Sequence, residues 1–467
     1  TNTDSAAGWT VDNGGFATNI LTVANAVTVN ALAAGEEVTI SAEIAGGGFT
    51  KNGAGVLTLS GVNTFTGPLS VRDGTLSIGT INDAGADGPL GNSASAVAIG
   101  ASGQAVTLQY TGGTAGSTKP FTLLAGGTGV VQVADAGTTL TLSGLIDGGG
   151  GLTKTGAGTL TLAGVNSHTG RTIIENGTVA IAAETGLGGN PGVLTADQLT
   201  LDGGTLAVSA NVTINDSNRG ITLGAGGGIV TPAATRTLTI SSGNVIAGAG
   251  SLTVTGAGTL TLSASNTFSG AVSVQTGTLS IATINNQSAV GPLGNSALAV
   301  TLGAGGQTGT LKYTGGSANS NKKLTMAGGG RGAIDVTAGA TTLTLSGVMD
   351  GGGGFAKNGT GTLDLNGTAN TFSGDVVING GKVQGVSANS LGTGTSITFA
   401  GTASFQSAYG AGPVFDQSVT VNAGATATFS VINGNYDMTI AGPVTGSGAI
   451  AVVYGDSNSG VLTLSNP

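Results

Sequence analysis

The chain contains no cysteine and has only one histidine, one tryptophan and nine prolines among its 467 residues. Without cysteine, no disulfide can hold the fold together. A single histidine excludes a metal site built from several histidines within one chain, and a Ser-His-Asp triad would have to use that one residue, His168. So few prolines exclude collagen, which needs abundant proline and glycine at every third position.

Charge is also scarce, because charged residues make up 7% of the chain and the net charge is −9. An acidic chain lacks the basic patch that nucleic-acid binding requires, so we expect no nucleic-acid partner. No apolar run approaches the roughly 20 residues of a membrane helix, so we expect no membrane-spanning segment. The opening residues do not resemble a signal peptide, which suggests mature or internal sequence.

Glycine is abundant instead, with 90 residues, and hydrophobic residues account for 39%. This content argues against disorder, and so much glycine argues against helices. Apolar residues alternate with threonine in stretches such as 57–59 and 160–162. This period of two is typical of strands with one buried face, and the Asn-Gly, Asp-Gly and Gly-Gly pairs between them favour tight turns. The composition therefore predicts an all-β protein.

The chain is a tandem duplication, because the segment at 80–93 returns 203 residues later at 283–296. The same shift relates Tyr110 to Tyr313 without a gap. We interpret residues 1–52 as N-terminal coils with a partial motif and residues 53–255 as the first super-repeat. Residues 256–467 are then the second super-repeat, which ends in a truncated motif, and all three parts form one continuous solenoid.

A shorter motif recurs about every 100 residues, at 53–78, 156–181, 256–281 and 359–383. Its short strands cannot bury a face alone, but stacked coils can, which favours a parallel β-solenoid. At roughly 20 residues per coil, we expect about 20–25 coils. An array of immunoglobulin-like sandwiches has a similar spacing, but the tryptophan and cysteine anchors of that fold are missing.

The motif reads Lys-X-Gly-X-Gly-Thr-Leu-X-Leu-X-Gly-X-Asn-X-Phe-X-Gly, followed by Val-X-X-Gly-Thr-Leu, and is clearest at 51–78, 154–181 and 256–281. It resembles the autotransporter-associated β-strand repeat, also called the passenger-associated transport repeat, of bacterial surface proteins. The resemblance covers most of the chain. It implies a right-handed parallel β-helix exported to the surface of a Gram-negative-type bacterium.

The residues that could carry catalysis or bind a metal are explained better by structural roles. His168 occupies the position of Phe65 in another copy of the motif, which indicates a packing substitution. Asp83 and Asp87 form the nearest approach to an acidic cluster, and we interpret them as a surface loop. We expect no cofactor, although the two Asp-Gly-Gly-Gly-Gly runs, at 147–151 and 350–354, leave an incidental calcium ion open.

Other recurring residues have structural interpretations as well. We expect three lysines before the Gly-X-Gly turn to be solvated at coil corners and to discourage edge pairing: Lys51, Lys154 and Lys357. We assign Tyr110 and Tyr313 to the core or to a coil face rather than to a sugar-binding platform.

The two ends of the chain read as complementary halves of one motif. Head-to-tail stacking would join them through Thr3, Val11, Gly14, Leu462 and Leu464. We therefore expect a non-enzymatic extracellular stalk, sheath or filament that binds itself or the rest of a longer array. The alternative is an adhesin passenger that binds glycans or surfaces, and a polysaccharide-acting enzyme is a third possibility.

Overall fold

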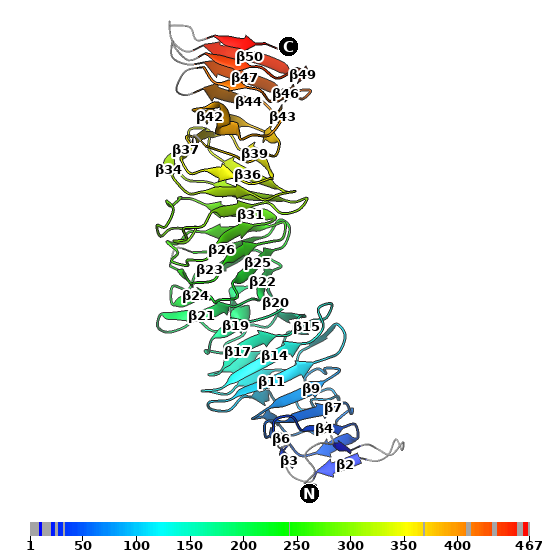
Figure 1. Ribbon diagram of the computed structural model, residues 1–467. Coiled ribbons are helices and arrows are strands. Elements are labelled where there is room, and N and C mark those ends of the chain that lie inside the picture. The colour runs from blue at the N-terminus through cyan, green and yellow to red at the C-terminus, as the bar shows by residue number, and fades with distance from the viewer. Residues whose placement is uncertain are drawn as a thin grey trace. The chain divides into compact units, whose positions relative to one another are not determined.

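The computed structural model describes residues 9–11, 20–23, 27–30, 33–241, 243–367, 369–407, 412–431, 437–454 and 461–465. It divides into two compact units, Thr1–Ile229 and Val230–Pro467. In each unit the chain winds through short strands that pair in parallel with those of the coils before and after, as Figure 1 shows for β9, β11 and β14. The predicted parallel β-solenoid is confirmed.

Three long strand stacks make up most of the described part of the first unit, beside the two-stranded pair of β2 (Ile20–Val23) and β5 (Glu43–Gly46). The first contains β1 (Trp9–Val11), β4 (Glu37–Ile40), β7 (Val56–Leu59), β9 (Thr75–Ile78), β11 (Ala105–Tyr110), β14 (Thr128–Val133), β17 (Gly151–Thr155), β19 (Thr172–Ile174), β21 (Thr195–Leu201) and β24 (Arg219–Leu223). The second contains β3 (Val27–Asn30), β6 (Phe49–Asn52), β8 (Leu69–Val71), β10 (Val97–Ile99), β13 (Phe121–Leu123) and β16 (Ile146–Gly148). The third contains β12 (Ala115–Ser117), β15 (Thr139–Leu142), β18 (Thr159–Leu162), β20 (Thr178–Ile181) and β22 (Thr205–Val208). The remaining elements are β23 (Val212–Ile214), β25 (Gly228–Pro232) and the 3₁₀ helix η1 (Glu184–Leu187).

The second unit repeats this plan. One stack contains β26 (Thr237–Ile240), β29 (Thr259–Leu262), β31 (Gly277–Ile281), β33 (Thr308–Tyr313), β36 (Arg331–Val336), β39 (Gly354–Asn358), β41 (Val376–Ile378), β43 (Ser396–Phe399), β46 (Ser418–Val421) and β49 (Val444–Gly446). Another contains β28 (Leu252–Val254), β30 (Val272–Val274), β32 (Val300–Leu302), β35 (Leu324–Met326) and β38 (Met349–Asp350). The third contains β34 (Ala318–Ser320), β37 (Thr342–Leu345), β40 (Thr362–Leu365), β42 (Gly381–Gly385), β44 (Ala403–Ser407), β47 (Thr426–Val431) and β50 (Ala449–Tyr454). The other elements are β27 (Ile246–Gly248), β45 (Val414–Phe415), β48 (Met438–Ile440), β51 (Leu462–Leu464) and the 3₁₀ helix η2 (Ala388–Leu391).

The described residues form about 18 turns rather than the 20–25 expected. The difference arises because coils vary in length. Paired residues Val56 and Thr75 are 19 residues apart, whereas Thr75 and its next partner Thr107 are 32 apart. The longer coil contains residues 80–96, with Pro-Leu-Gly-Asn-Ser at 89–93, and this spacer forms a loop instead of a further turn of strand.

The core consists of aliphatic columns that run from coil to coil. Leu140, Leu160, Val179 and Leu206 pair in succession and are at most 1% exposed. The threonines that alternate with them point outward and are half-buried. In-register stacking of apolar side chains is what lets short strands remove an inner face from water.

A buried asparagine in each motif fixes the coil just before a strand. The Asn166 carboxamide oxygen accepts the Ile146 backbone N–H at 3.0 Å, and its nitrogen donates to the Gly186 carbonyl at 3.0 Å. The same two-sided bonding is made by Asn63, Asn266 and Asn370. Each asparagine therefore connects three successive coils through backbone groups that are buried from water.

Candidate functional site

The three corner lysines are buried, which contradicts the expectation that they are solvated. Lys51, Lys154 and Lys357 are 0% exposed. The aliphatic part of each side chain continues a core column, while the ammonium group meets backbone carbonyls at the turn. The expectation was wrong because a side chain that points inward from a strand can still reach the turn that follows it.

Each ammonium group is held by three carbonyl oxygens and no carboxylate hydrogen bond is made. Lys154 Nζ donates to the carbonyls of Thr155 at 2.6 Å, Gly156 at 2.7 Å and Asn176 at 3.2 Å. Lys51 and Lys357 make the matching contacts. Loss of hydration disfavours the charged form and lowers the pKa of Lys154 to about 8.

A second set of buried cations lies above the turn that follows a Leu-Gly pair. Lys119 is 1% exposed and its Nζ donates to the carbonyls of Gly91 and Ser93, both at 2.7 Å. Lys322 is also 1% exposed and donates to the Ser296 carbonyl at 2.9 Å. In both copies burial lowers the pKa of the lysine. These residues fasten the loop of one coil to the coil that follows.

Arg219 fastens the turn at helix η1 to the coil that follows. It is 0% exposed and donates to the carbonyls of Leu187 at 3.1 Å and Gly188 at 3.0 Å. Its guanidinium also forms an ion pair with Glu184 at 3.3 Å. Burial lowers the pKa of Arg219, and Glu184 counteracts that effect.

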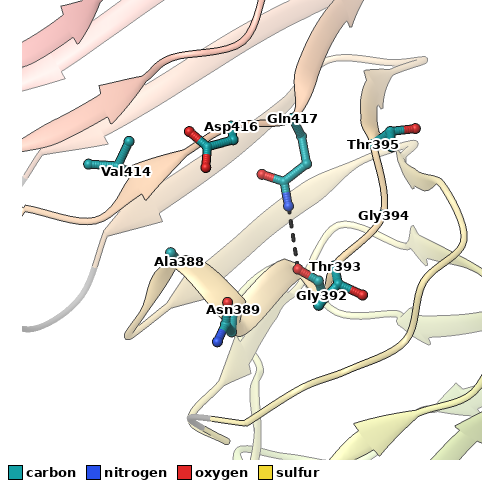
Figure 2. A pocket seen from close by; sticks show the side chains of 9 residues that line it. All are labelled: Ala388, Asn389, Gly392, Thr393, Gly394, Thr395, Val414, Asp416 and Gln417. Carbon is teal, nitrogen blue, oxygen red and sulfur yellow. Dashed lines mark hydrogen bonds between the residues drawn. The ribbon is translucent and has the colours of Figure 1, made fainter.

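The equivalent place above helix η2 is a surface cavity of about 330 Å³. Its wall includes Asn389, Gly392, Val414, Asp416 and Gln417, drawn in Figure 2. The Gln417 amide donates to the Gly392 carbonyl at 3.4 Å, a long hydrogen bond. Asp416 and Asn389 are exposed, so the cavity is open to solvent and lined mainly by polar groups.

His168 is buried, as its position in the motif predicts. It is 0% exposed, like Phe65, Phe268 and Phe372 in the other copies. Its Nε2 lies 3.0 Å from Thr172 Oγ1, and that hydroxyl donates to the Leu187 carbonyl at 3.1 Å. Burial, with Arg219 nearby, lowers the pKa of His168 to about 4, so the imidazole is neutral near pH 7.

The other candidates lie where the sequence placed them. Asp83 and Asp87 are exposed in a surface loop, and Asp83 accepts the Thr118 backbone N–H at 2.8 Å. Tyr110 and Tyr313 are 2% exposed, and each hydroxyl donates to a nearby glycine carbonyl at 2.6 Å. Within the described ranges there is no group of three or more His, Cys, Asp or Glu residues that could hold a metal ion.

The proposed joint is only partly described. Thr3 and Gly14 lie outside the described residues. Val11 pairs with Ile40, whereas Leu462 and Leu464 pair with Met438 and Ile440 in the other unit. Head-to-tail stacking through these residues therefore stays a prediction, as do the boundaries of the super-repeats.

The buried residues Lys119, Arg219, Lys322 and Gln417 were missed in the sequence. A signal for two of them was present, because the 203-residue shift relates Lys119 to Lys322. Arg219 and Gln417 follow loops of different length and carry different side chains, so only the stacking of the coils shows that the four positions are equivalent.

The fold and its repeating motif define a β-solenoid protein assembled from tandem copies of one unit. A profile of the passenger-associated-transport-repeat family matches four segments, residues 49–78, 152–181, 252–281 and 355–384. The chain belongs to this family. Among the described residues, no helix has the length and apolar character needed to cross a membrane.

One curated protein is similar to this chain over most of its length. Over 358 residues, 74% of this chain, the chain is 37% identical to "Adhesin BmaC autotransporter" of Brucella suis biovar 1 (strain 1330). The aligned part is 10% of that protein, so the chain spans about a tenth of the relative's length. No solved structure matches the chain.

Proposed function

We propose that this chain is a non-enzymatic segment of the passenger of an autotransporter-type adhesin, exposed on the surface of a Gram-negative bacterium. The observation that carries the proposal is the 37% identity to an autotransporter adhesin over 74% of the chain. The four copies of the passenger-associated-transport-repeat support it independently.

The structure supports an adhesive role over an enzymatic one. Carboxylates that act on polysaccharides must lie close together, about 5–10 Å apart in glycosidases. Among the described residues no group of three or more His, Cys, Asp or Glu side chains gathers, and the lining of the surface cavity has the single carboxylate of Asp416. Binding needs only a suitable surface, which the outward faces of the coils provide over many turns.

Surface display tests the proposal. The chain is fused to an unrelated outer-membrane anchor in a non-adherent bacterium, and binding of these cells to a printed glycan array and to immobilised proteins is counted. We expect binding that is saturable and is blocked by the soluble chain. Cells that bind no better than those displaying an unrelated β-solenoid of equal length would count against an adhesive role.

A stiff stalk or filament is the second candidate, because in each unit the coils stack through continuous parallel pairing. In that case the chain holds another adhesive part away from the cell. The same display experiment separates the two candidates when an established adhesive domain is placed at the tip. If the chain is a stalk, replacing it by the unrelated solenoid leaves all binding unchanged, because the tip domain provides that binding. If the chain is an adhesive segment, the replacement abolishes the binding that the tip domain does not provide.

A further inference from the structure

Four turns of the solenoid share one arrangement. They span residues 90–93, 187–190, 293–296 and 391–394, and each begins with a buried leucine followed by a glycine in the left-handed region. In each case the following coil places a long polar side chain over the turn, two residues before a buried core residue. These four side chains belong to Lys119, Arg219, Lys322 and Gln417.

Three of the four turns are covered by a cation from the chain itself. Lys119, Arg219 and Lys322 are at most 1% exposed, and their nitrogens lie 2.7–3.1 Å from carbonyl oxygens of the turn. Such charge-assisted bonds are stronger than neutral ones. The carbonyls of this turn are therefore arranged so that they bind an ammonium or a guanidinium group.

The fourth turn has the opposite distribution of charge. Gln417 replaces the cation, and its only hydrogen bond to the turn is the 3.4 Å contact with the Gly392 carbonyl. The residue before it is also different, because Asp416 stands where the other copies have the neutral residues Thr118, Asn218 and Asn321. In the first three turns a cation follows a neutral residue. In the fourth turn the neutral Gln417 follows the carboxylate of Asp416.

The cavity of about 330 Å³ opens at this fourth turn. Gly392 and Gly394, which correspond to the lysine-binding residues Gly91 and Ser93, line it together with Asp416. Val414 is 46% exposed and provides an apolar side. Figure 2 shows Asp416 and Val414 on one side of the cavity, facing helix η2 with Asn389. A flat cation can thus lie between carbonyls, a carboxylate and an aliphatic wall.

We propose that this cavity binds the guanidinium group of an arginine side chain from a partner protein. The partner supplies from outside the cation that three other turns obtain from their own chain. Arg219 shows that such a turn accepts a guanidinium, through carbonyl contacts and an ion pair with one carboxylate. A guanidinium offers five donors in a planar fork, which suits several carbonyls and a carboxylate together.

Titration of the full chain with N-acetyl-arginine amide, followed by saturation-transfer NMR, tests this proposal. N-acetyl-citrulline amide has nearly the same shape without the charge and is the control probe. We expect saturable binding of the arginine probe, at least about tenfold weaker binding of the citrulline probe, and a decline with ionic strength. Equal binding of both probes would refute a cation site. Displacement of the arginine probe by calcium chloride at lower concentration than by lysine amide would show a metal site instead.

Three variants locate the site. Asp416→Asn should weaken binding of the arginine probe about tenfold or more. Asp375→Asn removes an exposed carboxylate that does not line the cavity and should leave binding of the probe unchanged. Gln417→Lys should abolish binding and raise the melting temperature, because the new lysine covers the turn as Lys119 and Lys322 do. Retained binding in folded Asp416→Asn and Gln417→Lys would place the probe elsewhere and overturn the assignment.

The reverse exchange is a gain-of-function test. Thr118→Asp combined with Lys119→Gln copies the fourth turn into the first unit, and we expect the number of bound arginine probes to rise from one to two. Unchanged stoichiometry in a folded double variant would contradict the proposal. This inference goes beyond the adhesive role, because the probe measurements need no host surface and remain valid if surface display shows no adhesion.

Discussion

Lys154 and Val254 hold the same position in successive repeats, where they pair with Ile174 and Val274 of the next coil. Both side chains are 0% exposed. One ends in an ammonium group that three carbonyls hold, and the other ends in methyl groups. The fold thus contains its own comparison between a buried cation and an apolar side chain.

This comparison predicts that Lys154→Met is tolerated. The change removes three charge-assisted bonds, but it also removes the cost of burying a charge, and Val254 shows that the fold accepts an apolar side chain at this position. We expect local stability to change by about 1 kcal/mol or less, measured by hydrogen exchange of the β17 and β18 amides. Lys154→Glu, with a carboxylate facing carbonyls, should cost more than about 3 kcal/mol. A large loss in Lys154→Met would show that the carbonyls need a donor.

The corner lysines also predict a rise of stability with pH. Burial lowers the pKa of Lys51, Lys154 and Lys357 from 10.5 to about 8. Between pH 8 and 10.5 the unfolded chain keeps protons that the folded chain has released, so the free energy of unfolding increases with pH. Relative to Lys154→Met, the wild type should gain on the order of 1 kcal/mol from pH 7 to 9.5. If the free energy of unfolding changed with pH by the same amount in the wild type and in Lys154→Met, the lowered pKa of Lys154 would be contradicted.

His168 predicts the loss of stability in acid. Its pKa of about 4 in the folded chain lies below its usual 6.5. As the pH falls from 6.5 to 4 the unfolded chain takes up a proton that the folded chain does not, which removes up to about 3 kcal/mol.

The double variant His168→Phe/Thr172→Val restores the apolar pair of the third repeat, Phe268 and Val272. It should be more stable than wild type at pH 5, and most of that gain should be absent at pH 7.5, by thermal melting. A pH-independent gain would indicate better packing rather than removal of a titrating group.

The motif asparagines predict a large, local loss of stability. Asn166→Ala leaves the Ile146 N–H and the Gly186 carbonyl without their buried partner. Each unsatisfied group costs about 1–3 kcal/mol, so a total of about 2–6 kcal/mol is expected. Proteolysis near residues 146–186 should accelerate in this variant and not in Ser167→Ala, whose side chain is exposed. Similar cleavage of both variants would show that Asn166 does not stabilise these coils.

Much of the fold followed from local pattern. Alternation of leucine and threonine in 160–162 predicted a strand with one buried face, and the strand there is confirmed with Leu160 and Leu162 buried. The place of His168 among phenylalanines predicted its burial. Coil length was harder to predict, because it depends on whether a spacer such as 80–96 forms an extra turn or a loop.

The sequence by itself determined that the chain is an all-β repeat protein, since strand periodicity, glycine turns and the 203-residue shift are local or self-similar features. Only the tertiary structure decided where the charges lie. Lys154 and Lys119 look like surface residues in the sequence, but stacking brings carbonyls of neighbouring coils around their ammonium groups. The same stacking placed Asp416 and Gln417 over a turn more than 20 residues earlier. Contacts between coils depend on register and loop length together, and neither is encoded within a single motif.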